Sequence, residues 1–188
     1  APSASRDGTF VISGPEPAMP TATLFDQARG GSDVFLHLQT KRAGKIKGEA
    51  VAPGHVDDIV IMGWTWGLAA SSAIGSTQAT ARRSYKALTV TKGIDRASTS
   101  LMSALATNDE VKEAKICVRR SGGKQEDYYV VVLERGRISS IDQTLDGQGN
   151  TVEMVSIVFN KIDVEYRMQQ AKGGAGATST FSDEIYVA

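Results

Sequence analysis

The chain has little of the chemistry on which disulfides and metal sites depend. Its 188 residues include one cysteine, Cys117, and two histidines, His37 and His55. A single cysteine excludes a disulfide within the chain, and its position near Lys115 and Arg119 on an expected strand favours a structural role over a reactive thiol. Neither histidine has a histidine or cysteine partner at ligand spacing, so we expect no metal site and no cofactor.

Charge of one sign and long apolar runs are also missing. Lys+Arg and Asp+Glu number 21 each, so the net charge is zero. Neutrality argues against a protein that holds nucleic acid or an anionic membrane surface. No apolar run approaches the roughly 18 residues that a membrane-spanning helix needs. The N-terminus lacks the basic patch and apolar stretch of a secretory signal, so export, if it occurs, would not use such a leader.

Motifs typical of catalysis are absent as well. The sequence contains no G-x-S-x-G nucleophile elbow. Asp57 and Asp58 are neighbours on an expected extended segment, so their carboxylates should point apart and cannot form an acid/base pair. The glycine clusters lie between expected strands, which makes them hairpin turns and not phosphate-binding loops. One enzyme alternative stays open, a hydrolase whose site is assembled from His37, His55 and Asp57.

Proline is concentrated at one end of the chain. Four of the five prolines lie within residues 1–31, together with many small or polar residues and no long periodic segment. We interpret residues 1–31 as an N-terminal extension that is loosely structured unless it packs on a neighbour, and Met19 could mark an original start. Residues 32–188 are long enough for one domain with a substantial core.

The chain does contain a series of short strand-like segments separated by glycine turns. The expected strands are residues 33–40, 59–70, 85–94, 111–120, 127–134, 137–143, 151–160, 161–168 and 178–185. One convincing helix follows Ser98, which can cap its N-terminus, and Asn108 suits its left-handed exit. The expected fold class is mainly β: a small antiparallel β-barrel of two packed sheets with one short flanking α-helix.

The most distinctive stretch is residues 59–70, which carries both tryptophans and no charge. Alternation along one strand would put Val60, Met62, Trp64, Trp66 and Leu68 on one face, and Ile59, Ile61, Gly63, Thr65, Gly67 and Ala69 on the other. The first face is large and needs a core, whereas the second becomes small and smooth. Either the strand is buried on both sides, with glycines relieving crowding, or its small face is a surface on which another molecule docks.

Several strands look apolar on both faces. Val130 and Val132 point one way from their strand, and Val131 and Leu133 point the other way. A barrel standing alone in water needs only one apolar face per strand. Either the helix and loops cover the second face, or copies associate through sheet faces or edges, and a closed ring would use up the edges. Another alternative is a monomeric β-barrel that binds a small apolar ligand, which the tryptophan pair favours.

The order of several motifs gives the chain a family resemblance. From Asp33 onward it resembles the Hcp (haemolysin-coregulated protein) family, the tube protein of type VI secretion. The matching segments are D-V-F-L-H-L from Asp33, K-G-E from Lys47, D-I-V-I-M-G-W-T-W-G from Asp58, L-T-V-T-K-G-I-D-R-A-S from Leu88, A-K-I-C-V-R-R-S-G-G from Ala114, I-S-S-I from Ile138 and V-S-I-V-F-N-K-I-D-V-E-Y from Val155. Each segment is weak alone, but the ordered set is specific. The chain departs from the family pattern in residues 1–31, in its ending at 181–185 and at Arg82-Arg83.

This resemblance implies a structural, non-enzymatic subunit that forms rings of six, stacked into a hollow tube that a sheath drives out of a Gram-negative cell. The implied partners are further copies of the chain, effector proteins in the lumen, and the sheath and spike of the secretion machine. Neither nucleic acid nor membrane insertion is implied. The protein would reside in the bacterial cytoplasm before firing and then be secreted or delivered into a target cell.

The resemblance also suggests roles for individual residues. Family placement puts the tryptophan strand on the inner wall of the ring, with Trp64 and Trp66 anchored in the barrel core and Thr65 facing the lumen as a cargo contact. The long polar loop at 71–83 is the candidate for contact between stacked rings, by its length and by analogy to the family. The stacking candidates in and beside this loop are Ile74, Gln78, Arg82 and Arg83.

Overall fold

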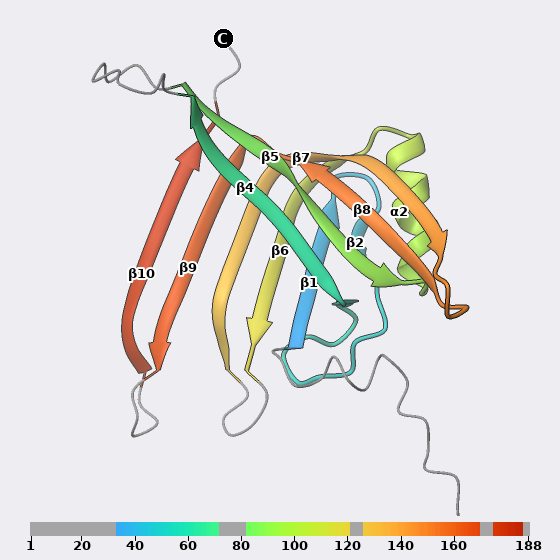
Figure 1. The fold of residues 1–188 in the computed structure, drawn as a ribbon, viewed down its shortest axis with the longest axis horizontal. Helices are drawn as coiled ribbons and strands as arrows, with labels where there is room; N and C mark the ends of the chain where they lie inside the picture. Colours follow the sequence, from blue (N-terminus) through green and yellow to red (C-terminus); the bar gives the residue numbers. More distant parts are fainter. Residues whose placement is uncertain (1–32, 72–81, 121–125, 170–174, 186–188) are drawn as a thin grey trace, which may run out of the picture. The chain divides into compact units, whose positions relative to one another are not determined.

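The computed structural model describes residues 33–71, 82–120, 126–169 and 175–185 (Figure 1). The chain divides into two units, Ala1–Gly30 and Gly31–Ala188, and the described residues belong to the second. The extension predicted for residues 1–31 lies outside them.

Strands dominate the described residues, and every pairing between them is antiparallel. The elements are β1 (Asp33–Thr40), β2 (Gly44–Ile46), β3 (Ile59–Ile61), β4 (Gly63–Ser71), β5 (Arg82–Gly93), α2 (Ala97–Ala106), β6 (Glu110–Arg119), β7 (Asp127–Leu145), β8 (Thr151–Val158), β9 (Lys161–Gln169) and β10 (Ala175–Glu184). The prediction of a mainly β fold, with packed antiparallel sheets and one short helix, is confirmed. In the described part of the chain the sheet does not close fully into a barrel.

The long strand β7 creates the two layers. Its first half pairs with β6 and β9, and its second half pairs with β8, which continues to β5 and β4. The bend lies at Arg135, whose φ is 53°, and at the buried Gly136. Figure 1 shows β7 passing from the layer of β10, β9, β6 and β1 into the layer that crosses it. The sequence predicts two strands here, 127–134 and 137–143. The structure has one continuous strand, because its residues stay paired on both sides of the bend while the partner strand changes.

Alternate side chains of both layers meet in a single core, as period-two alternation requires. The fully buried aliphatic residues of this core include Leu36, Leu38, Ile116, Val131 and Leu133 in the first layer and Val90, Val155 and Ile157 in the second. This core fixes the direction in which each strand presents its other face.

The face assignment for residues 59–70 is wrong in its first half, and the predicted burial also fails at Leu68, which is 46% exposed. Ile59 and Ile61 are buried, whereas Val60 and Met62 are about half exposed, with relative exposures of 49% and 48%. The cause is a break in the strand. β3 ends at Ile61 and pairs with β1, while β4 begins two residues later and pairs with β5. The Met62 amide at the junction donates to the Thr91 carbonyl at 2.8 Å. In β4 the alternation of side chains therefore starts again, with even-numbered residues such as Trp64 facing the core instead of odd-numbered ones such as Ile61.

The helix α2 begins differently from the prediction. Ser98 does not cap it, since the N-cap residue is Arg96, which makes no side-chain capping bond. The Ser98 hydroxyl is buried inside the first turn and donates to Glu153 Oε2 at 2.8 Å. The exit agrees with the sequence, because Asn108 adopts a left-handed φ of 50°. Among the described residues, no helix combines the length and the hydropathy needed to cross a bilayer.

Candidate functional site

The β4 strand presents Thr65 and the two tryptophans to opposite sides. Trp64 and Trp66 are half-buried and pack against the core. The Trp64 ring stacks on Tyr129 with centroids 6.0 Å apart, and the Trp66 ring stacks on Tyr85 with centroids 6.3 Å apart. Thr65 lies between them in sequence and is exposed. It therefore belongs to the outer face of the second layer.

Hydroxyl residues continue from Thr65 across this outer face. The strand registers pair Thr65 with Thr89, Thr89 with Ser156, and Ser156 with Ser140, so four strands contribute one row. The Thr89 and Ser156 hydroxyl oxygens lie 2.9 Å apart, which is a hydrogen bond. We call these four residues the hydroxyl row. Its side chains are uncharged and small. The sequence alone indicates only Thr65, because the strand registers are needed to find the other three.

The residues proposed for ring stacking are only partly within the described chain. Ile74 and Gln78 lie outside it, and Arg82 is described only as the first residue of β5. Arg83 is exposed, and its Nε lies 2.7 Å from Asp183 Oδ2 on β10. Tyr85 donates to the same carboxylate. Burial, followed by this hydrogen bond, raises the pKa of Tyr85 to about 12.

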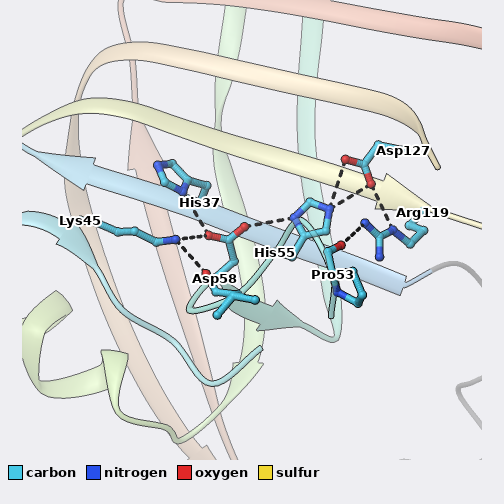
Figure 2. A network of polar contacts seen from close by, with 8 residues as sticks. His37, Lys45, Pro53, His55, Asp58, Arg119 and Asp127 are labelled. Atoms are coloured by element: carbon cyan, nitrogen blue, oxygen red, sulfur yellow. Dashed lines mark hydrogen bonds and ion pairs between the residues drawn. The ribbon is translucent and has the colours of Figure 1, made fainter. Parts of the chain in front are cut away.

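A polar network lies over the other layer, where the segment between β2 and β3 crosses β1 and β6 (Figure 2). Asp58 is its centre: Oδ1 lies 3.0 Å from His37 Nδ1 and 2.8 Å from Lys45 Nζ, and Oδ2 lies 3.0 Å from His55 Nδ1. Burial opposes ionisation of Asp58, but the bonds from Lys45, His37 and His55 outweigh it and lower its pKa. The network continues through His55 Nε2 to Asp127 Oδ1 at 3.0 Å.

The structure does not bring together the three residues of the hydrolase alternative, His37, His55 and Asp57. The sequence predicts an extended conformation at Asp57, but the residue has a φ of 63° in a turn. Its carboxylate contacts Arg96 at 2.8 Å. The two histidines meet at Asp58 instead. Sequence spacing could not reveal this, because the network joins positions from several elements and its member Asp127 lies 72 residues beyond His55.

One group in this network has the composition of a metal site. The ligand atoms of His55, Cys117 and Asp127 all lie within 4.8 Å of one another, whereas the sequence spacing had given no such partners. The surroundings suit a cation poorly. Arg119 Nε already lies 3.4 Å from Asp127 Oδ1. Burial, followed by the nearby Asp127 charge, raises the pKa of the Cys117 thiol to about 12, so the thiolate that a metal prefers is not preformed.

Comparisons with known proteins agree on one family. Residues 35–166 match the model of the family described as type VI secretion system effector, Hcp. The chain is similar to protein hcp1 of Pseudomonas aeruginosa, with 28% identity over 145 residues that cover 75% of this chain and 86% of the relative. It is also similar to the major exported protein of Pseudomonas aeruginosa, with 31% identity over 135 residues that cover 67% and 78%.

A solved structure supports the fold. A structure described as that of a type six secretion system protein superimposes with a TM-score of 0.74 and 21% identity, over 82% of this chain and 96% of that one. At that identity the likeness concerns the fold alone.

Proposed function

This chain belongs to the Hcp family of type VI secretion proteins, and on that premise we propose that it is a tube subunit that forms six-membered rings stacked into a hollow tube. The observation that carries the proposal is the family match over residues 35–166, which spans β1 to β8, the helix and most of β9. Both layers, apart from β10 and the end of β9, and the bend of β7 therefore belong to the matched region.

Exposed apolar side chains support assembly through the subunit's own surfaces. On the strands β3, β4, β8, β9 and β10 and at the junction between β3 and β4, the large apolar side chains with relative exposures of 37–54% are Val60, Met62, Leu68, Met154, Val158, Tyr166, Met168 and Phe181. Exposed apolar surface of this kind is typical of protein interfaces, because association removes it from water. Neighbouring subunits in a ring would cover part of it.

The hydroxyl row supports the placement of Thr65 on the lumen. A wall of small, uncharged hydroxyl groups offers hydrogen bonds without strong electrostatic attraction. Effector proteins held on such a wall would be released easily at delivery. The partners in this proposal are other copies of the chain, effector proteins, and the sheath and spike. The subunit would assemble in the bacterial cytoplasm, be exported with the machine and catalyse no reaction.

The alternative of a barrel that binds a small apolar ligand is not favoured. Trp64 and Trp66 stack on Tyr129 and Tyr85 and pack against the core. One pocket in the described part of the chain has polar or charged residues at four of its seven lining positions. Its lining consists of Glu110, Arg135, Gly136, Arg137, Val158, Phe159 and Asn160. Apolar ligands prefer a largely apolar lining.

A charged side chain at Thr65 tests the lumen assignment. Thr65→Lys should leave the rings intact and reduce the effector protein that co-fractionates with them, because the positive charge disturbs the neutral wall. Thr99→Lys, the same change at an exposed position on α2, is the matched control and should alter neither property. The measurements are ring mass and bound effector. Rings that dissociate only in Thr65→Lys would show that Thr65 lies in a subunit contact, and unchanged effector binding would reject the lumen contact.

A further inference from the structure

The His55 ring lies between two carboxylates that belong to different parts of the fold. Nδ1 is 3.0 Å from Asp58 Oδ2, which precedes β3, and Nε2 is 3.0 Å from Asp127 Oδ1, at the start of β7. The imidazole is buried, with 5% exposure, and stacks on Phe35 with ring centroids 4.4 Å apart. Figure 2 shows the ring aimed at both carboxylates at once. We call this arrangement the His55 bridge.

Hydrogen-bond chemistry restricts which form of the imidazole can donate to both carboxylates. A neutral imidazole has one N–H donor and one lone pair, whereas an ionised carboxylate only accepts. In a neutral ring, one of the two 3.0 Å contacts would therefore place a nitrogen lone pair against a carboxylate oxygen. Only the protonated ring donates to both partners. From this geometry we propose that the His55 bridge is a proton-dependent clamp that holds the 47–58 segment onto β7, and that deprotonation of His55 loosens this segment.

The charges that surround the ring come from four other elements. Asp58 and Asp127 favour the protonated ring. Arg119 on β6, 3.4 Å from Asp127, and Lys45 on β2, 2.8 Å from Asp58, oppose it. The remaining titratable neighbours are His37 on β1, which contacts Asp58, and Cys117 on β6. Charges of both signs thus lie on both sides of the ring, and the two directed hydrogen bonds are the contacts that require a second N–H on it.

The segment that the clamp holds also contacts β1, β2, β6 and the start of α2. Its own backbone bonds are internal: the Asp57 amide donates to the Ala50 carbonyl, and the Ala50 amide donates to the Asp58 carbonyl, each at 3.0 Å. Apart from the bridge, Arg119 Nη2 donates to the Pro53 carbonyl at 2.9 Å, and Asp58 Oδ1 lies within 3.0 Å of His37 and Lys45. Lys45 Nζ also donates to the Val56 carbonyl at 3.0 Å, and Arg96 contacts Asp57 at 2.8 Å. Among these described contacts, the bridge is the one that reaches β7. The segment leads directly into β3 and β4. Loosening of the segment would therefore also affect β3 and β4, the strands on either side of Met62.

Hydrogen exchange on the full-length protein tests the clamp. The reporters are the amides of Ala50, Asp57 and Asp58, with each rate divided by the unstructured rate at the same pH. We expect protection to fall about tenfold or more between pH 5.5 and pH 8.5, because a hydrogen bond to a charged group is lost. Imidazole nitrogen chemical shifts should report a ring protonated at both nitrogens at the lower pH.

Two variants separate the bridge from its surroundings. Asp127→Asn replaces the second carboxylate with an amide that can donate to a neutral ring, so protection should lose its pH dependence. His37→Gln, at the other histidine on Asp58, should retain it. Wild-type protection that does not change with pH, or a dependence that persists in Asp127→Asn, would overturn the proposal. Stoichiometric zinc uptake by the wild-type protein that is lost in Cys117→Ser would also overturn it, since a metal ion would then lie among His55, Cys117 and Asp127.

Discussion

Lys92 and Glu153 form an ion pair that is completely buried beneath the helix. Lys92 Nζ lies 2.8 Å from Glu153 Oε2 and 2.8 Å from Asp95 Oδ1, and it also donates to the Ser98 hydroxyl at 3.0 Å. Burial opposes ionisation of Glu153, but the hydrogen bonds from Lys92 and Ser98 outweigh it and lower its pKa. The pair therefore attaches the start of α2 to β5 and β8.

Removal of one partner should be costly. We predict that Lys92→Met destabilises the fold by about 3–5 kcal/mol, because Glu153 is left charged and unpaired in the interior. The double variant Lys92→Met/Glu153→Leu should recover much of that loss. Lys41→Met, which breaks an exposed ion pair with Glu110, is the control and should cost about 0–1 kcal/mol. Urea unfolding at one protein concentration measures all three, and equal losses in the two single variants would contradict the account.

The lowered carboxyl pKa values predict sensitivity to acid. The pKa values of Asp58 and Glu153 lie below their ordinary values of 3.8 and 4.5. A carboxyl whose pKa is lower in the folded state stabilises the fold above its unfolded pKa, and that contribution is lost as pH falls through the folded value. Stability from these two groups should therefore be complete at pH 6 and decline below about 4.5. Thermal unfolding between pH 6 and pH 3 checks this, and Asp58→Asn should show a shallower decline than the wild type.

At the scale of elements, the bend of β7 depends on a glycine that has no space for a side chain. A Cβ on Gly136 would lie 2.5 Å from the Val158 carbonyl oxygen, which belongs to the backbone and cannot move aside easily. We predict that Gly136→Ala costs about 1–3 kcal/mol in unfolding free energy. Gly147→Ala, in the turn between β7 and β8, is the control because a Cβ there would meet no atom within 4 Å. Similar unfolding midpoints for the two variants would mean that the strand can bend without this close approach.

The strands and the helix also differ in how well they could be predicted from the sequence. Alternation identified most strands, because the core-facing positions of β1, β6 and β8 repeat every second residue. It failed at Met62, where the chain leaves one ladder and joins another, and no residue type marks that change. It also missed the Ser98 contacts, because a serine before an apolar stripe has the same pattern whether it caps a helix or bonds to a distant Glu153.

At the scale of the whole molecule, the sequence predicted the fold class and family well and the polar network poorly. The family motifs extend along the chain and can be read in order. The His55 bridge depends on residues that come together only after β1, β6 and β7 have paired. The hydroxyl row likewise needs the registers of four strands, of which Thr65 alone was identifiable beforehand. Contacts between distant residues were thus the part that required the structure.

The central claim is that copies of this chain assemble into rings, and the mass of the purified protein in solution tests it most directly. Light scattering coupled to size-exclusion chromatography, run over a wide range of protein concentrations, gives that mass independently of shape. The account predicts a particle six times the 20.0 kDa mass of the chain. A particle of one chain mass that persists at the highest concentration would contradict it.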